Sequence, residues 1–242
     1  MTADVKPSQA RSQFFSRSAL IILALVLASF SFTYIFPVAT RSEHFSIVFH
    51  IHAAAFFGWV LLYAWQTRLV AANRVARHRE WGLAGIALSA MMVPLGIALA
   101  IAAARRRVTN GNPHPFDTTL FNVVDLATFA ILMTAGIVAV TRHPKWHRRF
   151  TFGAALCLLG PALSRWLLFI PEMAPWTDLL PNLAADLFLI ALVAHDRATL
   201  GRVHAATWGV IALLVPLHVV TPFLISSEWW RSIGPNIMSL AV

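Results

Sequence analysis

Residues 46–70 read SIVFHIHAAAFFGWVLLYAWQTRLV, and the only Lys, Arg, Asp or Glu in this stretch is Arg68. About 20 residues of this apolar character cross the ~30 Å hydrocarbon core of a bilayer as a helix. In lipid the backbone must satisfy its own hydrogen bonds, which favours α-helices. Counting this stretch, the sequence contains seven such segments: 19–38, 46–70, 82–104, 118–140, 150–170, 177–194 and 204–225. The sequence therefore predicts an all-α, polytopic transmembrane helix bundle of about seven spans.

The composition supports a membrane protein. Of 242 residues, 58% are hydrophobic and 12% are charged, whereas soluble domains contain about 25% charged residues. Too few charges remain to cover a soluble protein of this size, which argues against a soluble enzyme or a DNA-binding domain. The net charge of +9 comes from short basic clusters between apolar segments, so we expect no nucleic-acid partner. The lone Cys157 excludes an intrachain disulfide and a cysteine-based metal centre.

The basic loops predict an orientation. The N-terminal segment and every second loop carry 13 Lys and Arg residues, whereas the other loops and the C-terminal segment carry 5. The positive-inside rule then predicts a cytoplasmic N-terminal tail (1–17), a seven-helix transmembrane domain (18–226) and a periplasmic C-terminal tail (227–242). The run Arg105–Arg107 on the predicted outer side is an exception. We expect its side chains to snorkel or to bind lipid headgroups, unless one span is misplaced.

Five ionisable residues on five predicted spans form the most informative pattern. At 1.5 Å per residue, each lies roughly 9–13 Å from the outer end of its helix. Such residues are costly inside a membrane and suggest a functional site. We expect them to meet, either as an Asp125–Arg165–Asp186 salt-bridge network or as a binding site open toward the outer leaflet. The five are His52, Asp125, Arg165, Asp186 and His218.

Helical phase distinguishes the two histidines of the second span. Residues seven apart lie within ~20° of each other around a helix, so His52, Trp59 and Gln66 share one face, with Tyr63 beside it. His50 points to the opposite side. We therefore favour His52 over His50 as the histidine that faces the interior of the bundle, and His50 stays the alternative.

The last span carries His204 and His218, fourteen residues and ~21 Å apart. This spacing resembles that of di-haem b-type transmembrane cytochromes, in which one helix supplies a ligand to each of two haems. The resemblance implies an outer haem b between His218 and His52, and an inner one held by His204 with His147 or His78. Arg165, with Asp125 and Asp186, would hold haem propionates or a substrate headgroup. The chain departs from these cytochromes because no second helix repeats the spacing.

Short motifs at the ends of the spans suggest a second resemblance. These motifs are similar to those of uncharacterised multi-pass bacterial inner-membrane proteins. The resemblance implies a location in the inner membrane, but it implies no specific activity. They are the His50-x-His52 opening, Gln66-x-Arg68, His78-Arg79-x-x-Gly82 and Trp146-His147-Arg148-Arg149.

Two further chemistries remain open for the same layer. His52, His218, Asp125 and Asp186 offer two nitrogen and two oxygen donors, as in the zinc site of a membrane lipid hydrolase with Arg165 at a phosphate. The layer also suits a proton-coupled transporter or a quinone site, and a non-catalytic accessory subunit is an alternative. The leading hypothesis is a membrane redox protein that binds b-type haem or quinone, with membrane lipids and a redox protein as partners. Whether the protein is an enzyme stays open.

Overall fold

A computed structural model describes residues 7–239, and the described part contains helices and no strands. Six helices are long and apolar enough to cross a membrane, so the predicted all-α polytopic bundle is confirmed. The chain is a multi-pass membrane protein. The six spans are Gln13–Thr40, Ile47–Ala71, Val75–Thr109, Thr119–Ala139, Pro144–Leu167 and Ala205–Leu224.

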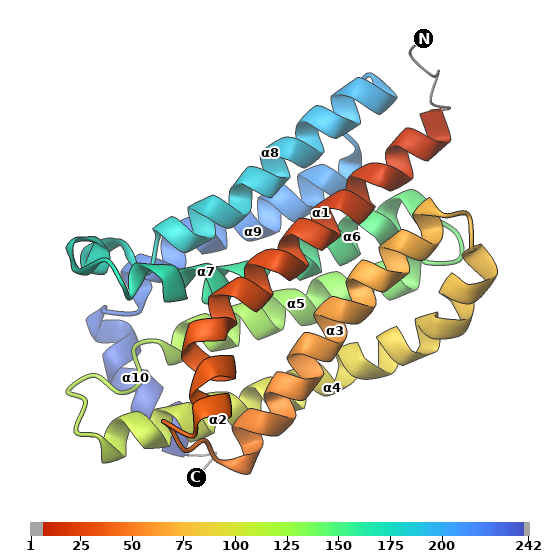
Figure 1. Cartoon of the computed structure of the whole chain (residues 1–242). Coiled ribbons are helices and arrows are strands. Elements are labelled where there is room, and N and C mark those ends of the chain that lie inside the picture. The colour runs from red at the N-terminus through yellow and green to blue at the C-terminus, as the bar shows by residue number, and fades with distance from the viewer. Residues whose placement is uncertain (1–6, 240–242) are drawn as a thin grey trace.

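The first span lies in one continuous stretch of helix, which has a π-helical turn near its C-terminal end (Figure 1). It begins at Pro7, so the described part of the predicted tail 1–17 is helical, while Lys6 lies outside the described residues. The elements are α1 (Pro7–Phe30), η1 (Ser31–Ile35), α2 (Phe36–Thr40), α3 (Ile47–Ala71), α4 (Val75–Thr109), α5 (Thr119–Ala139), α6 (Pro144–Leu156), α7 (Leu159–Leu167), η2 (Pro171–Trp176), α8 (Leu180–Leu200), α9 (Ala205–Leu224) and α10 (Glu228–Ser239).

The predicted sixth span, 177–194, corresponds to α8. This helix packs against α7 and α9 and runs alongside α9 (Figure 1). It is not among the six apolar spans, because it contains Asp186, Asp196 and Arg197. The bundle therefore has six apolar spans and one helix of mixed character.

The helices form a ring around a central, broken span. The neighbours in the ring are, in order, α1, α3, α4, α5, α9 and α8, and α8 closes the ring against α1. The central span comprises α6, which packs on α5 and α9, and α7, which packs on α1 and α8. This central span is 56% buried, against 22–33% for the other five. Because it is surrounded by protein, it does not need an apolar surface all round.

The break in the central span has a local cause. α6 ends at Leu156 and α7 begins at Leu159. Pro161 has no N–H, so the carbonyl of Cys157, four residues earlier, lacks its usual helical donor, and the proline ring crowds that carbonyl. The central span therefore bends between its two halves within the membrane-spanning region.

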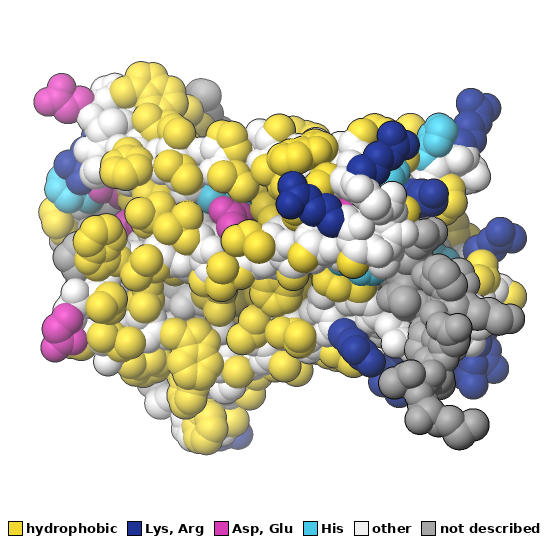
Figure 2. Space-filling view, turned by 90° about the horizontal axis from the view of Figure 1, so that it is seen from above, with side chains coloured by type: hydrophobic (Ala, Val, Ile, Leu, Met, Phe, Trp, Pro, Cys, Tyr) yellow, Lys and Arg dark blue, Asp and Glu magenta, His cyan; other side chains and the backbone are white. Residues whose placement is uncertain are grey.

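Basic side chains gather at one end of the bundle, and hydrophobic side chains cover its middle (Figure 2). This end, which we call the basic end, carries the α3–α4, α5–α6 and α8–α9 loops, and the opposite end is the far end. The arginine run Arg105–Arg107 lies at the far end because α4 continues to Thr109, beyond the predicted 104. Arg106 there pairs with Glu43 at 3.1 Å and lies over the ring of Phe45. At least this arginine has a protein partner in place of a lipid headgroup.

Candidate functional site

A carboxylate–imidazole pair joins α8 to α9 in the far half of the bundle. Nδ1 of His218 lies 2.7 Å from Oδ1 of Asp186. His218 is buried, and the Asp186 side chain is 14% exposed. The other carboxylate oxygen of Asp186, Oδ2, is buried and has no hydrogen-bond partner within the described residues. Two of the five predicted layer residues are therefore in direct contact, and one oxygen of the pair is available to a further group.

Asp125 approaches this pair from α5. A Cβ on Gly153 of α6 would lie 2.7 Å from Val210 of α9 and 3.2 Å from Leu132 of α5, which places these three positions at one level. His218 lies eight residues from Val210, and Asp125 lies seven residues from Leu132, both toward the far end. At 1.5 Å per residue, each is about 11–12 Å beyond the level of Gly153. The two side chains interact electrostatically. The predicted common depth is therefore found for this part of the layer.

Arg165 does not form the Asp125–Arg165–Asp186 network that the sequence suggested as one alternative. Its Nε donates to Oγ1 of Thr33 at 2.9 Å, and another nitrogen donates to the carbonyl of Pro161. Its guanidinium carbon lies 3.8 Å from the ring centroid of Phe30. No ion pair of the described residues includes Arg165. Thr33 lies in η1, and π-helical turns often occur at functional sites.

His52 and His218 do not form a pair, because α3 and α9 stand on opposite sides of the ring. His52 stacks on Phe56 at 6.0 Å, and its Nδ1 is buried without a hydrogen-bond partner in the described part of the chain. His50 instead lies 2.8 Å from the hydroxyl of Tyr34. Among residues 7–239, no three His, Cys, Asp or Glu side chains lie close enough to hold a metal ion. The described geometry thus gives no support to the predicted zinc set His52, His218, Asp125 and Asp186.

The histidines at the basic end pair differently from the predicted inner ligands. The rings of His78 and His147 meet edge to face with centroids 6.3 Å apart, and Nδ1 of His147 lies 2.9 Å from the carbonyl of Gly136. His204 packs against Trp146 instead, with centroids 5.6 Å apart. The described geometry therefore brings His78 to His147, and neither of them to His204.

The hydrogen bonds of each imidazole test its fit to haem. An iron-bound histidine usually donates the N–H of its other nitrogen to a carboxylate or a carbonyl. His218 and His147 have that arrangement. His204 does not fit, because its Nδ1 accepts the amide N–H of Ala206, which leaves the ring proton on Nε2. Among the described residues, His218 and His147 are therefore each suited to be one haem ligand. Helices α9 and α3 do not bring two such histidines together, and haem binding stays a prediction.

A buried polar cluster near the basic end is absent from the predicted site. Arg149 of α6 and Asp196 of α8 are fully buried and form an ion pair. Thr207 of α9 donates to Asp196 Oδ2 at 2.5 Å, and the backbone N–H of His204 donates to the same oxygen at 3.1 Å. Arg149 and Asp196 both lie just beyond the predicted limits of two spans, which is the signal in the sequence that points to this cluster. This cluster ties three helices together.

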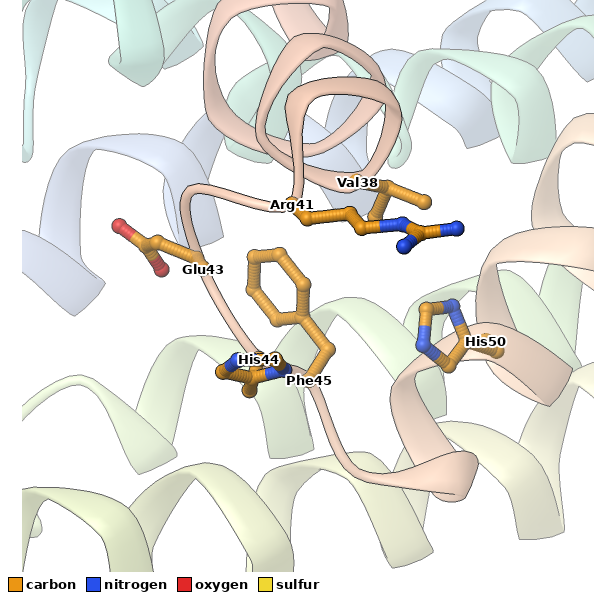
Figure 3. A pocket seen from close by; sticks show the side chains of 6 residues that line it. All are labelled: Val38, Arg41, Glu43, His44, Phe45 and His50. Carbon is orange, nitrogen blue, oxygen red and sulfur yellow. The ribbon is translucent and has the colours of Figure 1, made fainter.

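A pocket of about 280 Å³ opens at the far end, beside the turn between α2 and α3 (Figure 3). Arg41 and His50 approach it from two sides, and the ring of Phe45 lies beside them. Arg41 adopts a left-handed backbone conformation, with φ of 55°. Because His50 is held by Tyr34 and the pocket is open, we regard it as a surface feature separate from the layer.

Comparison with protein families, with curated proteins and with solved structures finds no match to this chain. The resemblances at the level of motifs therefore stay predictions. The chemistry of the far-half site carries the functional proposal, and its centre is the pair Asp186–His218 with Asp125 beside it.

Proposed function

We propose that the protein is a redox protein of the bacterial inner membrane that binds a quinone headgroup at the Asp186–His218 pair. One observation carries the proposal: a buried imidazole, 2.7 Å from a carboxylate inside the helix bundle, whose partner has a second, unpartnered oxygen. A quinone needs a hydrogen-bond donor at its carbonyl, and a quinol needs an acceptor at its hydroxyl. Imidazole serves as either, because it exchanges a proton near neutral pH.

The chain's own residues supply the proton chemistry in this proposal. When bound, a quinone supplies reversible uptake of electrons and protons, and the electrons come from a redox partner protein. Nδ1–H of His218 donates to Asp186, which fixes the ring orientation and leaves Nε2 for the ligand. Neutral Nε2 accepts from a quinol hydroxyl, whereas protonated Nε2 donates to a quinone carbonyl. Asp125 is the second carboxylate able to accept a proton nearby.

The position of the pair suits a ligand that arrives through the lipid. Asp186 is 14% exposed although it lies within a helix of the bundle. A lipid-soluble ligand would therefore reach the carboxylate between α8 and α9 without crossing the membrane.

The test is binding of a short-chain ubiquinone or menaquinone analogue to the purified protein, measured by equilibrium dialysis. We expect Asp186→Asn and His218→Gln to weaken binding at least tenfold. Matched controls are Asp117→Asn, at the exposed ion pair with Arg231, and His143→Gln, in the α5–α6 loop. Equal affinity in all variants would contradict the proposal. An oxidised and dithionite-reduced spectrum of the same sample tests the haem prediction separately, by the presence of a Soret band and a sharp reduced α-band.

A second candidate, proton-coupled transport, is favoured by the break between α6 and α7. Transporters commonly bind substrates and ions near discontinuous helices at mid-membrane depth. Here Cys157 at the break lies near Asp125 of the candidate site. Uptake of a solute driven by a pH gradient in proteoliposomes, lost in Asp125→Asn and Asp186→Asn but not in Asp117→Asn, would favour transport over quinone binding.

A further inference from the structure

A row of polar side chains follows the inner face of α3 toward the basic end. Relative to His52, the positions of Trp59, Tyr63 and Gln66 all fall within about 40° around the helix. Trp59 and Tyr63 are buried, as this shared face predicts. The residues on the opposite face, including Leu61 and Trp65, are 50% and 44% exposed. The polar row therefore faces protein and not lipid.

Several atoms of this row are buried without a partner. The hydroxyl of Tyr63, both amide atoms of Gln66 and Nδ1 of His78 have no hydrogen-bond partner within the described residues. Buried polar atoms are nearly always satisfied by protein or by water. A group of them within neighbouring helices indicates a polar space and not a sealed apolar core.

The row continues onto other helices at the basic end. His78, in the first turn of α4, lies beside the backbone of Gln66 of α3. Its ring meets that of His147, near the start of α6, edge to face with centroids 6.3 Å apart. These two helices begin in the loops of the basic end, so the row reaches the surface that the positive-inside rule places in the cytoplasm.

Aromatic side chains close the row at its inner limit. Tyr63 stacks on Trp59 with centroids 5.5 Å apart, and the Trp59 indole N–H donates to Ser89 at 2.7 Å. Phe129 of α5 meets Trp59 edge-on at 5.2 Å. Phe129 lies one helical turn from Asp125, which belongs to the candidate site. The row therefore ends one turn short of that site.

We propose that Tyr63, Gln66, His78 and His147 line a water-filled proton path from the basic end toward Asp125, with Trp59 and Phe129 as its seal. Water satisfies the unpartnered groups as hydrogen-bond donor and acceptor. Each transfer breaks an O–H or N–H bond on one group and forms one on the next, so nothing is consumed. The destination rests on the proposed function, whereas the path itself rests on the polar row.

Cysteine accessibility tests the path directly. In the full chain with Cys157→Ala, single cysteines replace Gln66 or Tyr63, and Trp65 or Leu61 serve as lipid-facing controls at similar depth. A small, positively charged methanethiosulfonate reagent is added to the basic end of the protein in vesicles. Thiols react as thiolates, which form in water and not in lipid. We expect Gln66→Cys and Tyr63→Cys to react at least tenfold faster than Trp65→Cys and Leu61→Cys.

The outcomes separate this proposal from the proposed function. Gln66→Cys reacting no faster than Trp65→Cys would overturn the path, even if quinone binds. Fast labelling of Gln66→Cys in a protein that binds no quinone would support the path and contradict only the quinone site. If Tyr63→Cys does not fold, the comparison of Gln66→Cys with Trp65→Cys decides alone. A Gln66→Leu variant should bind quinone with unchanged affinity, because residue 66 lies far from Asp186 along the membrane normal.

Discussion

Arg149 and Asp196 form an ion pair whose side chains are 1% and 0% exposed, and this pair joins α6 to α8. Thr207 and the backbone of His204 connect the same carboxylate to the start of α9. The carboxylate of Asp196 therefore connects α6, α8 and α9 at the basic end. The two residues lie 47 positions apart in sequence, so the pair fixes how the central span packs against the ring.

Asp196→Ala should be strongly destabilising, because it leaves the Arg149 guanidinium buried and unpaired. Removing one partner of a buried ion pair costs about 3–5 kcal/mol. Thermal unfolding of the detergent-solubilised protein measures the effect. The control is Asp117→Ala, which removes an ion pair with the exposed Arg231, and it should leave the melting temperature almost unchanged. Similar losses in both variants would contradict a structural role for the buried pair.

Stability should fall as the pH drops below neutrality, partly through His204. Burial, followed by the charge of Arg149, lowers the pKa of His204 from its usual value of 6.5. The unfolded chain then binds the proton more readily than the folded one, so the contribution is complete above about pH 6.5 and is lost below it. His204→Asn keeps a side-chain acceptor for the amide of Ala206. Melting temperatures between pH 7.5 and 5 should vary less in this variant; an unchanged slope would rule out the assignment.

Gly153→Ala should destabilise the bundle by about 1–3 kcal/mol, the usual range for overpacking a core. An added Cβ would lie 2.7 Å from Val210 of α9, where neither helix has free space. Gly82→Ala in α4 is the matched control, because its Cβ would meet nothing within 4 Å. Alanine favours a helix over glycine, so the control should be neutral or slightly more stable. Chemical denaturation distinguishes the two, and equal stability would mean that α6 and α9 are not in close contact.

The spans followed from the sequence because length and apolar character alone determine them. Six of the seven predicted segments are long apolar helices, and the segment 177–194 forms α8, whose aspartates lower its apolar character. Helix ends were harder to predict. α4 continues to Thr109, where Arg106 pairs with Glu43, a contact between residues 63 positions apart that no local pattern reveals.

The site followed from the sequence only in part. A constant helical rise placed Asp125, Asp186 and His218 at one depth, and these residues do lie together. Depth does not determine which helices are neighbours, so His52 and Arg165 were grouped with a cluster that they do not join. The sequence placed Arg149 in a basic loop motif and not in a buried site, because a buried basic residue beside a loop is indistinguishable in sequence from an exposed one.

The most direct test of the central claim is photo-crosslinking with an azido-quinone, followed by mass spectrometry of the labelled peptides. The account predicts labels on α8 or α9 close to Asp186 and His218, reduced by excess unlabelled quinone and lost in His218→Gln. Labels that avoid these two helices, or labels that excess quinone does not displace, would contradict a quinone site at the Asp186–His218 pair.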